Sequence, residues 1–552
     1  MEQWRLFLAI VLSIFVFFLW EVFFASHPPA PPQAPDKPAE TQKRPDKPAS
    51  AAKPGTSGTE LTQADQKIPE KAFKSVTVRS SLYTAEISER GAALTSFVLQ
   101  NYRQEAAPNA PLKQLIPGEN YAGTALVHLA GHDRKSWSNA RFTKNYSGDS
   151  LEIGNSRETL SFFWESPEGI VVEKQYTFFP ESYRVSLKVL IRNLSDQPIT
   201  GDLILTLQNP MDPDRSRFSF EGPFAYINQG LEEIDVGDIE DKDTYTGRIG
   251  WAGICDRYFM TVAVPAYDGE TRFTLAHEPE TDMVSVNYIQ PIEKILAKTQ
   301  DTADFSLYFG PKRMSTLREY DDNLQAALNF GFFDIIAKPC LWLMNFIHDH
   351  LVANYGVAII LLTILFKIIF WPLGSKSYRS MAEMKKLQPL MADIRKKYKD
   401  DKKRMNEEVM RLYKTYKVNP MSGCLPMLVQ IPVFIAFYRM LYEAIELRHA
   451  PFMLWINDLS APDRLFHFDI NIPLMLPPYG IPVLTIIMGA TMFLQQKLSP
   501  PPGDPAQAKF MMMMPLVLTV IFINFPAGLV LYWLVNNVIS IAQQYYITKK
   551  HV

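Results

Sequence analysis

Lys367 lies inside an apolar run, residues 359–371, where a charged side chain is unusual. If the run lies in a membrane, a charge at this depth is costly unless it faces water or a polar group. The single acidic residue within any apolar run, Glu21, lies near the outer end of the first run, which is the wrong end to pair with Lys367. Snorkelling of the lysine to the inner interface is one interpretation. The alternative that we favour is a water-filled cavity lined by this lysine.

Polar residues in other apolar runs predict the rest of this cavity. Thr363 lies one helical turn before Lys367, on the same face. Gln430 lies within the run of residues 424–441. In the last run, residues recurring at spacings of 4, 3 and 4 predict one polar stripe on a helix: Trp533, Asn537, Ser540 and Gln544, flanked by Asn536 and Gln543. Each residue alone could hold helices together, but beside an unpaired lysine they indicate a wetted groove.

The composition indicates a chain of several domains. It has 552 residues, too many for one ordinary domain, and its net charge of −2 hides a polar first half and a membrane-like second half. The three cysteines, Cys255, Cys340 and Cys424, show neither a CxxC nor a zinc-binding spacing. We interpret all three as small buried residues.

Two other classes of protein fit the sequence less well. An enzyme anchored to the membrane would need a carboxylate, histidine or serine constellation in residues 76–309, and no such motif is found. The chain has no P-loop pattern, and His348 and His350 do not share a helix face as metal ligands would. We therefore predict no enzymatic activity, catalytic residue, metal or cofactor. A transporter would usually show internal repeats, and none is found.

The N-terminal region is expected to be an anchor followed by a linker. The apolar run of residues 4–24 is about long enough to span a bilayer, and its end lacks the small residues of a signal-peptidase site. We therefore expect an uncleaved transmembrane anchor over residues 1–25, with Arg5 favouring a cytoplasmic N-terminus. Residues 28–54 contain nine prolines and predict a disordered linker over residues 26–75.

The next part of the chain has the pattern of β-strands. In residues 183–192, apolar side chains occupy every second position, and residues 172–178 alternate similarly. Glu89-Arg90-Gly91 separates two further strand-like segments and predicts a hairpin turn. Many short strands with turn signals predict a large all-β sandwich over residues 76–312. Because it follows an anchor whose N-terminus is inside, this domain is expected outside the cytoplasm.

The C-terminal part is membrane-like. Residues 332–352 mix apolar and polar side chains, which predicts an amphipathic interfacial helix within a linking segment, residues 313–355. The core, residues 356–552, is expected to be an α-helical bundle of five transmembrane segments: residues 357–373, 424–441, 481–494, 511–523 and 529–547. Several are short for isolated spans, so tilted packing, local thinning or a short hairpin would have to accommodate them.

The charges of the loops predict the orientation of these segments. Residues 374–420 contain 14 Lys and Arg and 6 Asp and Glu, whereas residues 443–480 contain 2 and 5. The positive-inside rule therefore places the first loop in the cytoplasm and the second outside. Lys549 and Lys550 place the C-terminus in the cytoplasm as well.

The cytoplasmic loop is predicted to be a helical hairpin over residues 375–418. Apolar residues recur in a heptad pattern at positions 384, 387, 391, 394 and 398, and again at 405, 409, 412 and 416. Asp401 lies where it could cap the second helix. Six basic residues are candidates for contact with ribosomal RNA, a targeting receptor or anionic lipids: Lys385, Lys386, Arg395, Lys396, Lys402 and Lys403. The alternative is an ordinary solvated loop.

The whole pattern resembles the YidC family of membrane insertases, in its Gram-negative type with a large periplasmic domain. The motifs that carry the resemblance are LYFGPK (307–312), YKTYKVNP (413–420), GCLP (423–426), QIPVF (430–434), APFMLWINDL (450–459) and FPAGLVLYW (525–533). Together these motifs are specific, although none alone would be.

The resemblance implies a multi-pass protein of the bacterial inner membrane. It implies insertion of nascent membrane proteins, alone or beside the Sec translocon, through a hydrophilic groove open to the cytoplasm and to lipid. From the basic surface of the hairpin we also expect contact with the ribosome, and we expect no DNA partner. Many members have arginine where this chain has Lys367, so only electrostatic attraction, and not bidentate recognition, is expected of this residue.

Overall fold

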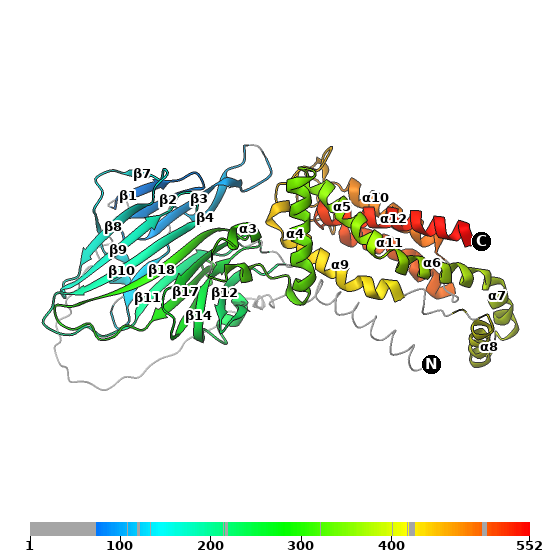
Figure 1. The fold of residues 1–552 in the computed structure, drawn as a ribbon, viewed down its shortest axis with the longest axis horizontal. Helices are drawn as coiled ribbons and strands as arrows, with labels where there is room; N and C mark the ends of the chain where they lie inside the picture. Colours follow the sequence, from blue (N-terminus) through cyan, green and yellow to red (C-terminus); the bar gives the residue numbers. More distant parts are fainter. Residues whose placement is uncertain are drawn as a thin grey trace, which may run out of the picture. The chain divides into compact units, whose positions relative to one another are not determined.

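The computed structural model describes residues 73–551, except residues 108, 119–121, 133, 213–214, 216–218, 321, 400, 417, 419–424 and 500–504. The predicted anchor, nearly all of the predicted linker and Cys424 lie outside the described residues. The described chain has a β-rich domain followed by a helical region, as predicted (Figure 1).

The first sheet of the β-rich domain has five strands in the order β4-β3-β2-β1-β7. Their bounds are β1 (Ser75–Arg79), β2 (Tyr83–Ser88), β3 (Leu94–Arg103), β4 (Leu112–Pro117) and β7 (Ser150–Glu152). The predicted turn joins β2 to β3, which pair antiparallel. Gly91 in this turn has a φ of +62°, and a Cβ there would lie 2.7 Å from the Ser138 carbonyl oxygen. Glycine is therefore the residue that fits this turn.

The second sheet has thirteen strands, eleven of them in the order β5-β11-β17-β16-β14-β15-β18-β10-β9-β8-β6, while β12 pairs with β13 and β14. The bounds are β5 (Leu126–Leu129), β6 (Thr143–Lys144), β8 (Glu158–Glu165), β9 (Ile170–Phe178), β10 (Arg184–Asn193), β11 (Leu203–Pro210), β12 (Gly222–Ile227), β13 (Gly230–Glu233), β14 (Thr244–Cys255), β15 (Phe259–Pro265), β16 (Glu270–Glu278), β17 (Met283–Gln290) and β18 (Gln300–Pro311). The helices α2 (Arg134–Asn139) and η2 (Val236–Ile239) lie between strands.

The apolar positions of the alternating pattern that predicted β10 are the buried positions of this strand. Val185, Leu187, Val189 and Ile191 are almost wholly buried, and the residues between them are partly exposed. The strand pairs antiparallel with both β9 and β18. The two sheets pack on each other, since Phe97 of β3 stacks on a ring of β18 with centroids 4.9 Å apart. One hydrophobic core therefore serves both sheets.

A buried lysine also joins the two sheets. The Lys174 ammonium of β9 donates hydrogen bonds to the carbonyl oxygens of Gly91 (3.1 Å), Ala92 (2.8 Å) and Ala125 (2.7 Å). The Tyr176 hydroxyl donates to Ala92 as well (2.7 Å). Burial lowers the pKa of Lys174 to about 7, because desolvation disfavours the ammonium. The three carbonyl acceptors oppose that effect, since they match the three donors of an ammonium.

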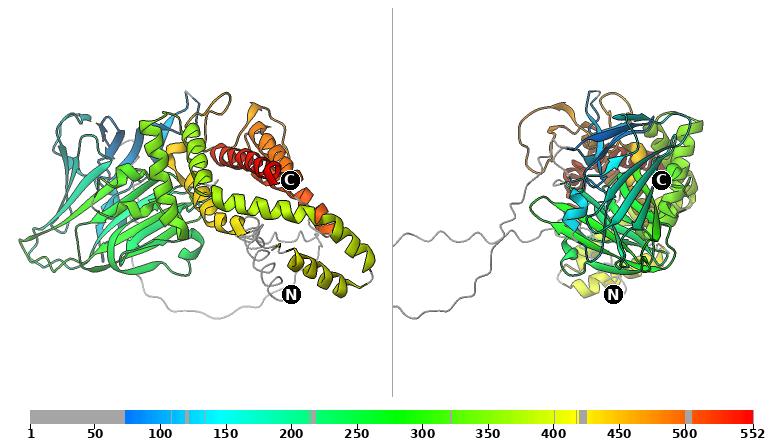
Figure 2. Two further views of the ribbon diagram at one scale, coloured as in Figure 1. Left: turned by 45° about the vertical axis from the view of Figure 1, so that its right-hand side comes forward. Right: turned by 90° about the vertical axis from the view of Figure 1, so that its left-hand side faces the viewer.

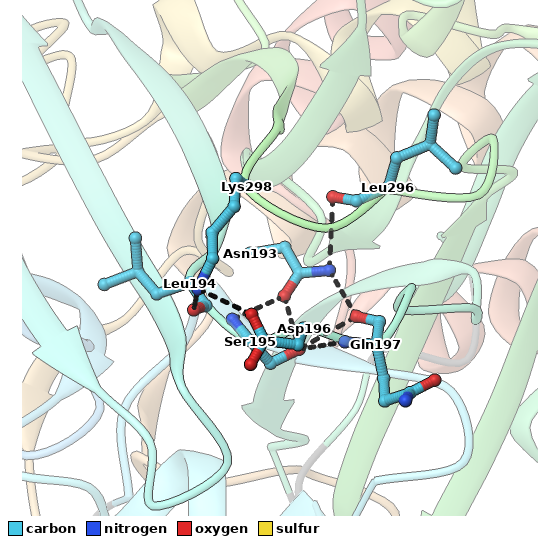
Figure 3. Close-up of polar contacts among 7 residues, drawn as sticks. All are labelled: Asn193, Leu194, Ser195, Asp196, Gln197, Leu296 and Lys298. Atoms are coloured by element: carbon cyan, nitrogen blue, oxygen red, sulfur yellow. Dashed lines mark hydrogen bonds and ion pairs between the residues drawn. The ribbon is translucent and has the colours of Figure 1, made fainter.

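A buried asparagine organises the turn that follows β10 (Figure 3). The Asn193 amide nitrogen donates to the carbonyl oxygens of Gln197 (2.7 Å), Ile295 (3.1 Å) and Leu296 (3.2 Å). Its amide oxygen accepts from the Ser195 backbone N–H (2.9 Å) and hydroxyl (2.7 Å). One side chain thus holds its own turn and the loop before β18 together.

The helical region begins directly after β18. Its elements are α3 (Met314–Leu317), η3 (Leu324–Ala327), η4 (Gly331–Phe333), α4 (Asp334–His350), α5 (Tyr355–Ile369), α6 (Trp371–Lys386), α7 (Gln388–Lys397), α8 (Lys402–Thr415), α9 (Leu425–Glu443), η6 (Ile445–Leu447), β19 (Leu465–His467), β20 (Gly480–Ile481), α10 (Val483–Leu498), α11 (Pro505–Phe522) and α12 (Ala527–His551). The C-terminal helix α12 packs against α5, α6, α9 and α10, which makes it the centre of this region (Figure 1).

One bent pair of helices in this region has the length and composition of a membrane span. Among the described residues, no single helix is both long enough and apolar enough to cross a membrane. The pair α5 and α6 passes together, with a bend of 65° between them, and α10 and residues 511–522 form shorter apolar helices. The expected five transmembrane segments thus remain a prediction.

The predicted amphipathic helix corresponds to η4 and α4. One face of α4 is buried and includes Cys340, Leu341 and Met344. The other face exposes Trp342 and Phe346, whose rings stack with centroids 5.6 Å apart. The exposed face is thus apolar as well, which suits an interfacial position, although that position stays a prediction.

The predicted cytoplasmic hairpin is formed by α7 and α8, which lie side by side at one end of the helical region (Figure 2). The Asp401 carboxylate caps α8 by accepting from the Arg404 N–H (3.0 Å), as expected. The predicted seam is wrong at its last position. Tyr416 is 53% exposed because α8 ends one residue before it, and Tyr413 contacts Met391 instead through a 3.4 Å hydroxyl–sulfur hydrogen bond.

Candidate functional site

Lys367 lies in the last turn of α5. The helix begins after Asn354, whose side chain accepts from the Val357 N–H (3.0 Å), and it ends at Ile369. Pro372, in the first turn of α6, explains the break between the two helices. Since the C-terminal end of a helix carries a partial negative charge, this position favours a cation.

The Lys367 ammonium is bound by a hydroxyl and not by a carboxylate. It donates a 2.7 Å hydrogen bond to Ser540 Oγ of α12. The Ser540 hydroxyl in turn donates to the Asn536 carbonyl oxygen (2.6 Å), so its proton points into its own helix. Within the described part of the chain, Lys367 takes part in no ion pair. The lysine is half-buried and Ser540 is buried, so the charge is only partly compensated.

Two amides extend this polar contact along α12. The Gln543 amide nitrogen donates to the Trp371 carbonyl oxygen (3.1 Å) and to Ser375 Oγ (3.3 Å), at the break between α5 and α6. The Gln430 amide of α9 donates to Asn536 Oδ1 (3.4 Å). The face of α12 with Asn536, Ser540 and Gln543 therefore meets α9, α5 and α6 in turn.

The residues of the predicted polar stripe lie on two faces of α12. Asn537 donates to Thr491 Oγ1 of α10 (3.4 Å), and Gln544 donates to Ser499 Oγ at the end of the same helix (3.4 Å). Asn537 and Ser540 are three residues and thus about 60° apart on the helix, and they contact different neighbours, α10 and α5. The stripe is thus divided between α10 and the Lys367 side.

Trp533 and Thr363 have other surroundings. The Trp533 ring makes edge contacts with Phe434 (5.1 Å between centroids) and Phe522 (4.9 Å), and its buried N–H has no hydrogen-bond acceptor in the described residues. Thr363 is buried, and its hydroxyl donates to the Ile359 carbonyl oxygen of its own helix (2.7 Å). The structure therefore brings Lys367 and Ser540 into direct contact. It links Gln430 to them through Asn536.

The sequence placed Gln543 only beside the stripe, although it makes the closest side-chain contact to the α5–α6 break. The sequence feature that could have identified Gln543 is its spacing of seven residues from Asn536, because residues seven apart lie on one face of a helix. Ser375 was not singled out at all. A serine directly after Trp371-Pro372-Leu-Gly gives no pattern of its own, and its role depends on the bend.

Four of the six candidate basic residues of the hairpin are exposed. Lys385 and Lys386 are exposed at the end of α6, and Lys396 and Lys403 are exposed on α7 and α8. Arg395 is only partly exposed. Lys402 begins α8, but its side chain lies outside the described structure.

The two histidines near the end of α4 bind different groups. The His348 ring contacts the Asp349 carboxylate (2.8 Å) and stacks on Tyr355, with centroids 3.8 Å apart. The His350 ring contacts the Phe346 carbonyl oxygen (3.1 Å). No group of three or more potential metal ligands is found among the residues that the structure describes.

Comparisons with known proteins match nearly the whole chain. The family model of the YidC periplasmic domain matches residues 75–343, and the model of the 60Kd inner membrane protein matches residues 346–552. The chain is 40% identical to a membrane protein insertase YidC of Syntrophobacter fumaroxidans, with 99% of both chains covered. It is 39% identical to the protein of that name from Syntrophus aciditrophicus, over 98% of this chain and 99% of the other.

A crystal structure of an active YidC insertase, with its first transmembrane domain resolved, is among the similar solved structures. The comparison covers 86% of this chain and 92% of the other, with 20% sequence identity and a TM-score of 0.38.

Proposed function

Since the chain belongs to the YidC family of membrane protein insertases, and is thus an inner-membrane protein that inserts other proteins into the bilayer, we propose that Lys367 marks a hydrated groove for the polar part of the substrate. One observation carries this proposal. The Lys367 ammonium has a single described acceptor, the Ser540 hydroxyl, and no carboxylate among the described residues forms an ion pair with it. A positive charge left over in an apolar helix attracts acidic segments and water.

The surrounding polar residues would hydrate the same segment. Gln430 and Asn536 lie on the α9 side of Lys367, and Gln543 lies on the α6 side. Thr363 and Asn537 are proposed to line the groove when a substrate displaces their present hydrogen bonds. Such groups lower the cost of bringing the polar segment part-way into the bilayer.

Burial of the apolar segment of the substrate would drive the step. That segment slides into lipid along the outer surface of the helices, while its polar leading part passes Lys367. This mechanism needs no nucleotide, metal, catalytic residue or other cofactor. The aromatic cluster around Trp533 would close the groove at its deeper end.

The topology and the partners belong to the same proposal. We place five membrane segments in residues 356–552 and a sixth in the anchor, with both termini in the cytoplasm and residues 76–312 in the periplasm. The exposed lysines of the hairpin, among them Lys385, Lys396 and Lys403, would receive the nascent chain by contact with the ribosome, a targeting receptor or anionic lipids. Cooperation with the Sec translocon is also proposed, and binding to DNA is not.

Insertion of a small single-span protein into liposomes that contain only this protein tests the proposed groove. Lys367→Leu should lose most of the insertion, and Lys367→Arg should keep it. Lys497→Leu is the matched control, because Lys497 is exposed in the last turn of α10. If Lys367→Leu inserts as well as the Lys497→Leu control, the lysine has no part in insertion and the proposed groove is wrong.

A further inference from the structure

An exposed apolar loop forms the last part of the segment between α9 and α10, directly before α10. We call residues 465–482 the apolar loop; β19 and β20 close its base by antiparallel pairing. Its large side chains are exposed: Phe466 by 71%, Ile470 by 69%, Leu474 by 74% and Leu476 by 61%. The loop has one acidic residue, the exposed Asp469, and residues 470–482 after it contain no charged residue. So many neighbouring apolar side chains on a surface mark an interaction site and not a solvated loop.

The backbone of the loop is held in a conformation that its side chains disfavour. Phe466 and Leu474 have φ angles of 54° and 68°, and Leu454, in the preceding segment, has a φ of 56° and is also highly exposed. Glycine or asparagine adopts this left-handed region more easily than leucine or phenylalanine. Inside the protein these three side chains gain little burial to offset that cost. Their size therefore serves contact with something outside the protein.

Several peptide groups of the apolar loop are hydrogen-bonded to polar side chains of the protein. The buried Arg464 donates to the carbonyl oxygens of Pro478 (2.9 Å) and Leu476 (3.4 Å). Asn524, between α11 and α12, accepts from the Leu476 N–H (2.9 Å) and donates to the Leu474 carbonyl oxygen (2.8 Å). A segment inside a bilayer needs this property, because hydrocarbon cannot bind free N–H and C=O groups.

The same network fixes the loop to the ends of the membrane-like helices. Arg464 also donates to the carbonyl oxygen of Ile523 (2.8 Å), and Asp463 accepts from the Trp455 indole N–H (2.6 Å) and from the first turn of α10 at Leu484. Hydrogen bonds to the ends of these helices therefore hold the backbone that carries the exposed apolar side chains.

The length of α10 indicates what covers the loop. This helix has 16 residues, which at about 1.5 Å per residue is shorter than the roughly 30 Å of a bilayer core. Its exposed face carries Ile486 and Ile487 in its first turn, directly after the apolar loop. The apolar loop directly precedes this face in the sequence, and its exposed side chains add apolar length to the short helix.

We propose that the apolar loop is immersed in the half of the lipid bilayer next to the N-terminus of α10, with acyl chains covering Phe466, Ile470, Leu474 and Leu476. The proposal rests on the membrane position of α10, which belongs to the proposed function. Immersion sets the depth of the ends of α10 and α11 on that side, since Asp463 binds the first turn of α10 and Arg464 binds Ile523 directly after α11. Asn524, which binds the loop, lies in the short segment between α11 and α12.

Nitroxide labels in the full-length protein test the depth of the loop. Single cysteines are introduced as Ile470→Cys and Leu474→Cys after Cys255, Cys340 and Cys424 are replaced by alanine, and the protein is placed in liposomes of phosphatidylethanolamine and phosphatidylglycerol. Ile487→Cys is the control for lipid exposure, and Glu280→Cys, on an exposed turn of the β-rich domain, is the control for water. Insertion activity of each labelled protein shows that it is folded.

Collisions of the labels with oxygen and with a water-soluble nickel chelate are then measured. Labels at 470 and 474 should resemble the label at 487, accessible to oxygen and protected from nickel by at least fivefold relative to the label at 280. Nickel access at 470 and 474, with protection at 487, overturns the proposal but leaves α10 in the membrane. Protection from both reagents also overturns it, because a protein then covers the loop. Nickel access at 487 overturns the proposal together with the membrane position of α10.

Discussion

The Lys367 ammonium and the Ser540 hydroxyl, 173 residues apart in the sequence, form a 2.7 Å hydrogen bond that joins α5 to α12. Ser540 Oγ is the single described acceptor for this charge, and its own proton is used by the Asn536 carbonyl oxygen. The contact therefore holds two helices together and leaves the charge available to a stronger acceptor. A substrate carboxylate would be such an acceptor.

Ser540→Ala removes the acceptor and leaves the lysine charge in place. Since a hydrogen bond to a charged group contributes about 1.5–3 kcal/mol, we expect a loss of stability near the lower end of this range, because water reaches the half-buried ammonium. Insertion should fall by no more than about threefold, which corresponds to less than 1 kcal/mol. Thermal unfolding and liposome insertion measure the two effects. A complete loss of insertion would show that the lysine charge alone is not sufficient and that the serine hydroxyl is needed as well.

The charge of the substrate should matter at Lys367. Two versions of one single-span substrate are compared, with acidic and with neutral leading segments. The native protein should prefer the acidic version, and Lys367→Leu should reduce that preference by about tenfold, equivalent to about 1.4 kcal/mol of lost attraction. Lys367→Arg should preserve it. Equal losses for both substrates would mean that Lys367 supports the fold of the groove and does not attract charge.

Asn193 should be important for the stability of the β-rich domain. Asn193→Ala removes five hydrogen bonds, including the side-chain acceptor of the Ser195 N–H, so we expect a loss of about 3 kcal/mol. Hydrogen exchange of the amides in β10 and β18 measures it in the full-length protein. Asn155→Ala, at an exposed position, is the control and should change protection little. Unchanged protection in Asn193→Ala would contradict the role of this turn.

The β-rich domain should lose stability in mild acid through His128 of β5. Burial, assisted by the charge of Arg134, lowers the pKa of His128 from 6.5 to about 4. The unfolded chain therefore binds a proton between pH 6.5 and 4 that the folded domain does not, and stability falls as the pH falls through this window. Because the ring is partly exposed, we expect about 1 kcal/mol.

The measurement compares the unfolding free energy at pH 7 and pH 4.5 in the native protein and in His128→Gln. The other histidines are common to both proteins, so the difference between them isolates His128. A loss of the same size in both would show that another group causes the acid sensitivity.

Leu474→Gly should separate the backbone cost of the apolar loop from its contact with lipid. The φ of Leu474 is 68°, so glycine should relieve about 1 kcal/mol of strain and raise stability in detergent. In liposomes the missing side chain should place a label at position 470 closer to water. Leu476→Gly is the matched control: it removes a similar side chain where φ is not positive, so it should give no gain in detergent. A gain in both variants would contradict the strain at Leu474.

The sequence predicted those features that depend on residues close together in the chain. The alternation in residues 183–192 predicted β10 and its buried face, and Asp401 predicted the cap of α8, because strand period and capping depend on neighbouring residues. The depth of Lys367 in its apolar run also led directly to the residue whose charge has no carboxylate.

Features that depend on contacts between distant segments could not be predicted. Residues 357–373 were expected to form one segment, but α5 ends at Ile369 and α6 leaves at 65°. That bend is what brings Trp371 and Ser375 to Gln543. The division of the polar residues of α12 between two neighbours also follows from the positions of α5 and α10, and no spacing within α12 specifies which helix lies where.

The three carbonyl acceptors of Lys174 come from both sheets of the β-rich domain, so neither sheet is expected to fold without the other. Gly91 and Ala92 belong to the turn of the first sheet, and Ala125 precedes β5 of the second. A truncated chain that begins after β4 would keep a buried ammonium with one acceptor instead of three. Expression fragments of this domain therefore have to begin before β1, or carry an apolar residue in place of Lys174, if they are to fold alone.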